Sequence, residues 1–216
     1  MTIERLTIKR FAEGLSLAEY LAKEQEMVKS VAETTLFTWI VSPTVIYGHH
    51  QSAEVEVNEA YCREHGIDVV QRKSGGGCVY ADRGNLMISF VTPDTRSEQV
   101  FRDFLTLVAR ALQAKGLPAV TTDHNDILVE GRKVSGWACY ICPTGTIVHG
   151  TMLYDVNLDD LQQAITPTAA KLAKHAVASV RQRVANLREI TNVFRDIHAL
   201  RAYIEEAVSN VPPKAE

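Results

Sequence analysis

Apolar positions recur along the chain with two spacings, one typical of helices and one typical of strands. The helical spacing is clearest over 15–31, where Ser16 occupies the N-cap position, and over 99–115, which ends before Gly116. A shorter helix is predicted over 58–65, and helical patterns return at 158–164, 167–175 and 192–208. Strands are predicted over β-branched and aromatic runs at 2–8, 36–41, 45–48, 69–72, 78–81 and 86–92, and the stretch 119–156 is strand-rich.

The order of these elements predicts the fold class. Several strands follow one another with short turns between them, as in hairpins, and helices stand between and after them. This order is typical of an α+β fold with a mixed or antiparallel β-sheet flanked by helices. The run at 45–48 is expected to continue the 36–41 strand beyond the turn at Ser42-Pro43. At 216 residues the chain is expected to form a single domain, 1–216, with 209–216 as a loose tail.

Composition narrows the class of protein. Hydrophobic residues make up 46% and charged residues 23% of the chain, as in ordinary soluble globular proteins. The net charge of -3 gives no general attraction to nucleic acid or to anionic membranes. No apolar run approaches the roughly 20 residues that a membrane span needs, and the N-terminus lacks an apolar signal core. We therefore expect a cytoplasmic protein with neither nucleic acid nor membrane as a partner.

The chain contains four cysteines, and two of them have a spacing that occurs in metal and redox sites. Cys139 and Cys142 have a suggestive spacing, but they lie in a predicted strand. Side chains alternate faces along a strand, so a separation of three residues places the two sulfurs on opposite faces. Neither zinc nor a disulfide suits that arrangement, and the four cysteines are interpreted as structural thiols.

A glycine-rich loop between two predicted strands is the first candidate for chemistry. It reads Arg72-Lys73-Ser74-Gly75-Gly76-Gly77, and three successive glycines let the backbone approach a ligand and direct N–H groups at an anion. Arg72 and Lys73 add positive charge suited to a phosphate or a carboxylate. The loop matches neither a Walker loop nor a GxGxxG turn. Anion binding is favoured over a merely flexible hairpin, because a glycine run carries an entropic cost.

Three further segments carry polar groups in or beside predicted strands. Asn125-Asp126 offers an amide and a carboxylate for a magnesium ion on a phosphate, and Lys133 follows the tight Glu130-Gly131 turn. On composition alone a solvated strand end is the favoured explanation of Lys133, and a hydrogen-bonded structural group is the favoured explanation of His149. Gly150, inside a strand, marks a close approach of a ligand or another backbone.

Taken in order, these motifs resemble the lipoate-protein ligase A family. The resemblance rests on Arg72–Leu86, Asn125-Asp126-Ile127, Gly131–Gly136, His149–Leu153 and Ser179–Leu187, and it extends over roughly 36–187. It implies the α+β catalytic-domain fold that this family shares with biotin ligases. The Ser-Gly-Gly-Gly loop and His149-Gly150-Thr151 favour the lipoyl type over the biotin type.

The resemblance also implies roles for individual residues. Lys133 would be the catalytic lysine, contacting both the acyl carbonyl and the phosphate, and Asp126 would hold Mg²⁺. The substrate- and nucleotide-binding residues would be Arg72, Ser74, Gly75, Gly76, Gly77, Val79, Tyr80, Asp82, Asn85, Asn125, Asp126, Gly136, Ala138, His149 and Gly150. Within this set, Asp82 and Asn85 would hold the turn beside the nucleotide, and Gly136, Ala138, His149 and Gly150 would shape an acyl tunnel.

The implied activity is a lipoate-protein ligase reaction in two halves. Lipoate and ATP, with Mg²⁺, form lipoyl-AMP, and the lipoyl group then passes to a lysine of a lipoyl carrier domain. The carrier would be a 2-oxoacid dehydrogenase E2 subunit or a glycine cleavage H protein. Basic residues that could attract such an acidic domain are Lys171, Lys174, Arg181, Arg183 and Arg188.

Three departures from the family pattern keep alternatives open. Ala81 stands where the family usually has histidine, and Trp137 stands where a small residue is usual. The small C-terminal domain that assists adenylation is expected to be absent, or supplied by a separate accessory chain. The alternatives are a transferase taking octanoyl or lipoyl groups from a carrier protein, which needs a nucleophilic cysteine, and a non-catalytic lipoate-binding relative.

Overall fold

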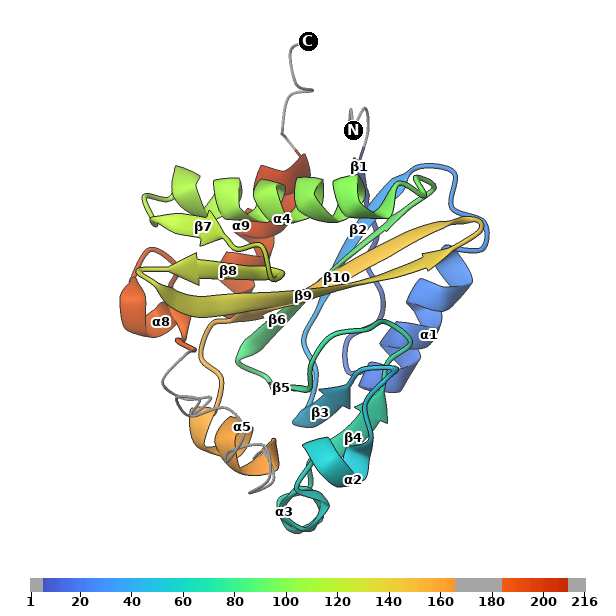
Figure 1. Cartoon of the computed structure of the whole chain (residues 1–216). Helices are drawn as coiled ribbons and strands as arrows, with labels where there is room; N and C mark the ends of the chain where they lie inside the picture. Colours follow the sequence, from blue (N-terminus) through green and yellow to red (C-terminus); the bar gives the residue numbers. More distant parts are fainter. Residues whose placement is uncertain (1–5, 166–183, 210–216) are drawn as a thin grey trace.

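A seven-stranded mixed sheet forms the centre of the protein (Figure 1). The structure is a computed structural model, and it describes residues 6–165 and 184–209. In spatial order the strands are β1 (Leu6–Ile8), β2 (Thr34–Trp39), β6 (Asn85–Thr92), β10 (Gly145–Leu153), β9 (Arg132–Cys142), β8 (Asp126–Val129) and β7 (Ala119–Thr121). β1 pairs parallel with β2, and the other neighbours pair antiparallel. The predicted α+β class with a mixed sheet flanked by helices is confirmed.

A second sheet of three strands lies beside the first. Its order is β4 (Asp68–Gln71), β3 (Thr44–Tyr47) and β5 (Val79–Ala81). The prediction that 45–48 continues the strand before it is therefore wrong. Pro43 has no N–H to extend a ladder, so the chain turns there and Thr44 begins a strand that pairs parallel with β4. This sheet carries both ends of the glycine-rich loop, because the loop joins β4 to β5.

Helices cover both faces of the large sheet (Figure 1). α4 (Ser97–Ala114) and α9 (Ile197–Ser209) pack on one face, and α1 (Leu17–Met27) packs on the other. Alternate residues of β6 serve the two faces: Ile88 and Phe90 join the α4 core, whereas Met87 and Val91 join the α1 core. All eight residues of β6 are buried for this reason.

Most of the predicted helices are present. Ser16 is the N-cap of α1, as the sequence predicts, and it forms a full capping box with Glu19. The helix predicted over 192–208 begins only at Ile197, after the short helix α8 (Leu187–Ile190). α3 (Glu59–Glu64) and α5 (Leu158–Ala164) are confirmed, while α2 (Ala53–Glu56) was not predicted. The helix predicted over 167–175, residues 2–5 of the first strand and the tail from 210 lie outside the described residues. Within the described ranges, no helix is long and apolar enough to cross a membrane.

Candidate active site

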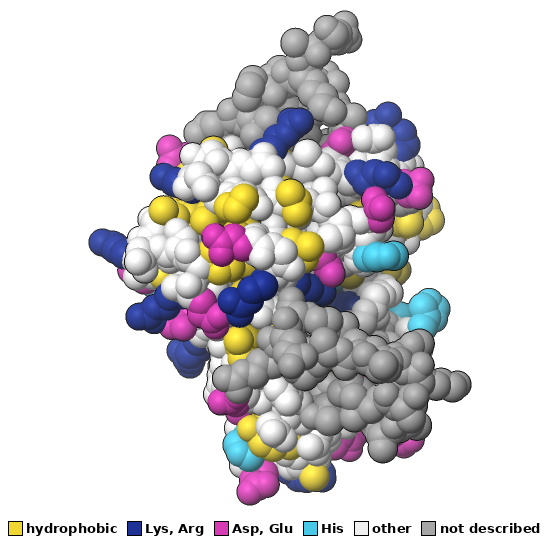
Figure 2. Space-filling model, turned by 60° about the vertical axis from the view of Figure 1, so that its left-hand side comes forward, with side chains coloured by type: hydrophobic (Ala, Val, Ile, Leu, Met, Phe, Trp, Pro, Cys, Tyr) yellow, Lys and Arg dark blue, Asp and Glu magenta, His cyan; other side chains and the backbone are white. Residues whose placement is uncertain are grey.

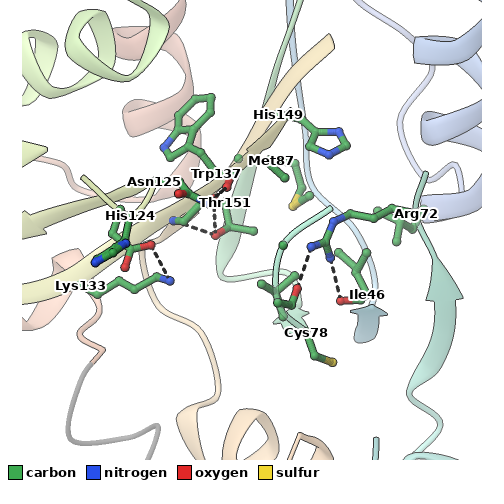
Figure 3. A pocket seen from close by; sticks show the side chains of 18 of the residues that line it. Ile46, Arg72, Cys78, Met87, His124, Asn125, Lys133, Trp137, His149 and Thr151 are labelled. Carbon is green, nitrogen blue, oxygen red and sulfur yellow. Dashed lines mark hydrogen bonds and ion pairs between the residues drawn. The ribbon is translucent and has the colours of Figure 1, made fainter. Parts of the chain in front are cut away.

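A cavity of about 210 Å³ opens where the glycine loop faces β9, β10 and α1 (Figure 3). Arg72 and Lys133 enter it from opposite sides. Its lining consists of Leu17, Leu21, Ile46, Arg72, Gly76, Gly77, Cys78, Val79, Met87, His124, Asn125, Asp126, Lys133, Gly136, Trp137, Ala138, His149, Gly150 and Thr151. Apolar walls with a few convergent polar groups are typical of a small-molecule site.

The floor of the cavity is formed by strands β9 and β10 of the large sheet. Gly136 and Ala138 on β9 stand opposite Thr151 and His149 on β10, so these four residues share one face. Between them Gly150 pairs with Trp137, whose indole lies on the opposite face among the α4 core. A Cβ at Gly150 would lie 2.3 Å from Cδ2 of Trp137, and only glycine fits beneath that ring.

Lys133 lies beside a carboxylate at one end of this floor. Its Nζ is 2.7 Å from Oδ1 of Asp126, and both side chains are about one-third exposed or less, at 32% and 26%. Lys133 comes just after the turn of the β8–β9 hairpin and pairs with Leu128, and from there its side chain reaches Asp126 at the start of β8. Asn125 adopts a φ of 74°, and its Nδ2 donates to the Trp137 carbonyl, which fixes the turn leading into Asp126.

Arg72 holds the glycine loop in shape. Its Nη2 donates to the carbonyls of Gly75 and Gly77, at 2.7 Å each, and its Nη1 donates to the carbonyl of Ile46. Burial lowers the pKa of the Arg72 guanidinium, although the group remains a cation at any ordinary pH. Arg72 is predicted to provide charge for an anion, and most of its donors are used on the loop itself.

The structure brings together eleven of the sixteen residues predicted for the site. Arg72, Gly76, Gly77, Val79, Asn125, Asp126, Lys133, Gly136, Ala138, His149 and Gly150 all line the cavity. Ser74, Gly75, Tyr80, Asp82 and Asn85 do not line it. Whether the eleven bind a substrate remains a prediction.

The five residues outside the lining all have hydrogen-bond partners within the protein. Tyr80 is buried and donates its hydroxyl to Asp160, because alternation along β5 turns it away from Val79. Asp82 accepts from the amides of Gly84 and Asn157 and so holds its turn, and burial raises its pKa. Asn85 is buried at the start of β6.

Eight lining residues were not predicted for the site. They are Leu17, Leu21, Ile46, Cys78, Met87, His124, Trp137 and Thr151. The apolar members have the same spacing as ordinary core residues, so the sequence carries no signal that separates them from the core. His124 and Thr151 are neighbours of predicted residues in the sequence, and Thr151 also belongs to the His149-Gly150-Thr151 motif.

Asp126, predicted to hold Mg²⁺, and the four cysteines all lie within the described ranges, 6–165 and 184–209. No group of three His, Cys, Asp or Glu side chains in those ranges is placed to hold a metal ion. Asp126 provides a carboxylate in the lining, which suits magnesium that keeps waters and binds mainly through substrate phosphates. The four cysteines are free, as predicted, and burial raises the pKa of Cys139 to about 11.

Of the basic residues considered for carrier docking, only Arg188 lies within the described ranges, and it pairs with Asp155. Lys171, Lys174, Arg181 and Arg183 fall outside them. On the face shown in Figure 2, the basic and acidic side chains of the described residues are interspersed and form no patch of one sign.

Comparisons with known proteins agree on one family. A sequence model of the lipoyl protein ligase A/B catalytic domain matches residues 11–209. Lipoate–protein ligase 1 of Staphylococcus aureus is 38% identical over 191 residues, which are 87% of this chain and 58% of that protein. The chain thus spans less than two thirds of that relative.

Two solved structures are similar throughout. One belongs to a bi-partite lipoate protein ligase of Thermoplasma acidophilum, studied with its E2 lipoyl domain; it has a TM-score of 0.83 at 26% identity and covers 98% of this chain and 86% of that one. The other is a lipoate-protein ligase A bound with ATP; it has a TM-score of 0.81 at 26% identity and covers 95% of this chain and 83% of that one.

Proposed function

Because the chain belongs to the lipoyl protein ligase A/B catalytic-domain family, we propose that it joins lipoate to a lysine of a carrier domain through lipoyl-AMP. The observation that carries this proposal is the position of Lys133. It stands on a paired strand, at the edge of a narrow apolar cavity that also faces the glycine loop. A cation there can reach both a phosphate and an acyl carbonyl.

In the first half of the proposed reaction, a carboxylate oxygen of lipoate attacks the α-phosphorus of ATP. The bond between the α-phosphorus and the bridging oxygen breaks, and pyrophosphate leaves with that electron pair. Lys133 neutralises charge that develops on the phosphate oxygens, and glycine-loop N–H groups can do the same. Mg²⁺, when bound through Asp126 and the phosphates, would supply further positive charge.

In the second half, the ε-amine of the carrier lysine attacks the acyl carbon of lipoyl-AMP. The carbonyl oxygen gains negative charge in the tetrahedral state, and Lys133 stabilises it. The amine loses a proton as the amide forms, and AMP leaves with the oxygen that joined it to the acyl group. The lack of bulky side chains at Gly136 and Ala138 leaves room for the acyl chain to lie against the sheet.

Two parts of the proposal extend beyond the cavity. The carrier would be an E2 lipoyl domain or a glycine cleavage H protein, and the bi-partite ligase studied with its E2 lipoyl domain supports the former. An accessory domain that assists adenylation is also proposed, either joined to this domain or as a second chain, and the relative described as bi-partite supports the second form.

A thioester transferase is the second candidate, because Cys78 lies in the cavity lining. Such an enzyme needs a thiolate as nucleophile. Cys139 and Cys142 suit that role less well: Cys139 has a raised pKa, and Cys142 contacts Thr144 and Gly145 at a hairpin turn. A protein that binds lipoate without turning it over is the third candidate.

The deciding experiment measures lipoyl transfer to an apo carrier domain by the purified chain. One arm contains lipoate with Mg-ATP, and the other contains synthetic lipoyl-AMP. Lys133→Ala is expected to lower transfer by about 10²–10³-fold in both arms, while Lys29→Ala, an exposed lysine after α1, serves as the matched control. Transfer only from lipoyl-AMP would mean that adenylation needs the accessory chain. No transfer from either donor would reject the ligase proposal.

A further inference from the structure

A chain of hydrogen bonds runs from the glycine loop through the sheet to helix α1. Arg72 Nε lies 3.0 Å from Ser74 Oγ, and Ser74 Oγ lies 2.7 Å from His149 Nε2. His149 Nδ1 in turn lies 2.9 Å from Oε2 of Glu24. All four residues are buried, with exposures of 6%, 1%, 8% and 0% along the chain from Arg72 to Glu24. A buried cation and a buried carboxylate are thus joined by two side chains.

The donors and acceptors in this chain fit one direction. Arginine can only donate, so Ser74 Oγ accepts from Arg72 and has its own hydrogen left for His149 Nε2. His149 then carries its proton on Nδ1 and donates it to Glu24. If Nε2 carried a proton instead, the Ser74 hydrogen would have no acceptor among the described residues. The network therefore assigns the Nδ1–H tautomer.

The glycine loop depends on the first member of the chain. Arg72 donates to the carbonyls of Gly75 and Gly77, which turns these oxygens toward the guanidinium. Gly76 between them has a φ of 90°, and a Cβ there would lie 3.0 Å from Arg72 Nη2. The loop is wrapped closely around the arginine, and Ser74 helps to hold the arginine in that position.

Glu24 is the far anchor of the chain and does not line the cavity. Its Oε1 also accepts from Ser89 Oγ on β6, so the carboxylate is tied to the sheet as well as to His149. Burying a carboxylate without such donors would be strongly unfavourable. The hydrogen bonds of Glu24 to Ser89 and His149 therefore hold α1 against the sheet.

We propose that Glu24 is a positioning residue that shapes the glycine loop from a distance. Glu24 fixes the tautomer of His149 by accepting its Nδ1 proton. His149 then orients the Ser74 hydroxyl, and that hydroxyl holds Arg72 against the loop carbonyls. The effect on catalysis rests on the proposed ligase function. The effect on the loop does not, and it can be measured without any substrate.

The first test uses the wild-type protein and needs no variant. Long-range ¹H–¹⁵N NMR of the histidine rings reports which nitrogen carries the proton. We expect His149, assigned by comparison with His149→Gln, to show the Nδ1–H tautomer. A ring protonated on Nε2, alone or together with Nδ1, would overturn the proposal.

The second test measures the loop directly by limited trypsin digestion. Lys73 is exposed in the loop, and cleavage of the Lys73–Ser74 bond is followed by mass spectrometry. Glu24→Gln should raise this rate by about tenfold, the effect of losing one charged hydrogen bond. Ser89→Ala removes a hydrogen bond to the same carboxylate that is not part of the Arg72–Ser74–His149–Glu24 series. It should change the cleavage rate less than about twofold.

Cleavage after Lys29, which is also exposed, gives an internal reference for global unfolding. An equal rise at Lys29 and Lys73 would mean general destabilisation and would overturn the proposal, as would an unchanged rate at Lys73.

A double-mutant cycle tests the connection between the two ends. Glu24 and Ser74 are joined through His149, so Glu24→Gln combined with Ser74→Ala should open the loop little more than either change alone. Fully additive effects would overturn the proposal. If the wild-type protein proved to have no ligase activity, the NMR and digestion results would still decide the role of Glu24.

Discussion

The side chain of Lys133 lies across the backbone of Gly136, three residues further along the same strand. A Cβ at Gly136 would be 3.0 Å from both Cε and Nζ of the lysine. The absence of a side chain at 136 therefore allows the ammonium group to lie flat over the sheet and to reach Asp126. This relationship gives a structural reason for the glycine that ends the Gly131–Gly136 motif.

Gly136→Ala should therefore impair catalysis without a comparable loss of stability. The new methyl group displaces the lysine, and a misplacement of about 1 Å can reduce the rate by about 10²-fold. The measurement is single-turnover transfer from lipoyl-AMP, together with the midpoint of thermal unfolding. Unchanged transfer would show that Lys133 does not act from this position.

Gly150→Ala, unlike Gly136→Ala, should lower stability more than catalysis. The added Cβ would lie 2.3 Å from the Trp137 ring, and overpacking of a core costs about 1–3 kcal/mol. Urea unfolding measures this cost, and Gly75→Ala, where a Cβ meets nothing within 4 Å, is the control. In a cycle with Trp137→Leu, the alanine should cost much less, since the ring is gone. The same cost in both backgrounds would disprove the clash.

Cys78→Ala separates the ligase from the thioester transferase. The ligase mechanism makes no bond to a cysteine, so transfer from lipoyl-AMP should stay within about threefold of wild type, as expected for a small change in the lining. Cys139→Ala is the matched control, since Cys139 lies on the strand that forms the floor but does not line the cavity. Loss of transfer with Cys78→Ala alone, together with a trapped acyl-thioester on the wild-type protein, would favour the transferase.

Glu205 on α9 should make stability depend on pH. Burial alone would raise the pKa of its carboxyl, but hydrogen bonds from Thr38 and Arg10 and the charge of Arg201 outweigh burial and lower it. A lowered folded-state pKa contributes stability that is complete above the unfolded value near 4.5 and is lost as the pH falls through the folded value.

Glu205→Gln should therefore cost about 1.5–3 kcal/mol at pH 7, the range for hydrogen bonds to a charged group, and the difference from wild type should shrink below pH 4.5. Urea unfolding at pH 7 and pH 4 measures it. Glu206→Gln, the exposed neighbour, is the control. A cost that does not change between the two pH values would show that the ionised carboxylate contributes nothing.

Much of the secondary structure and part of the site could be predicted because they depend on local patterns. Ser16 and Glu19 form their capping box within one turn of helix, and the glycine run and Lys133 stand in short motifs. The start of α9 was misplaced because 192–196 shares apolar spacing with the helix but lies before it. The motifs alone do not show which of their residues face the cavity. Val79 lines the cavity and its neighbour Tyr80 is buried away from it, because side chains alternate faces along β5.

The sequence by itself determined the fold class, the glycine-rich loop and the family, because periodicity and motif spacing are local properties of the chain. Tertiary structure alone decided that β3 belongs to a second sheet, that α1 lines the cavity, and that Arg72 donates to carbonyls of the glycine loop. It also placed Glu24 against His149, although 125 residues separate them in the chain. The physical reason is that strand pairing and side-chain contacts between distant segments depend on long-range register and packing, which no local pattern encodes.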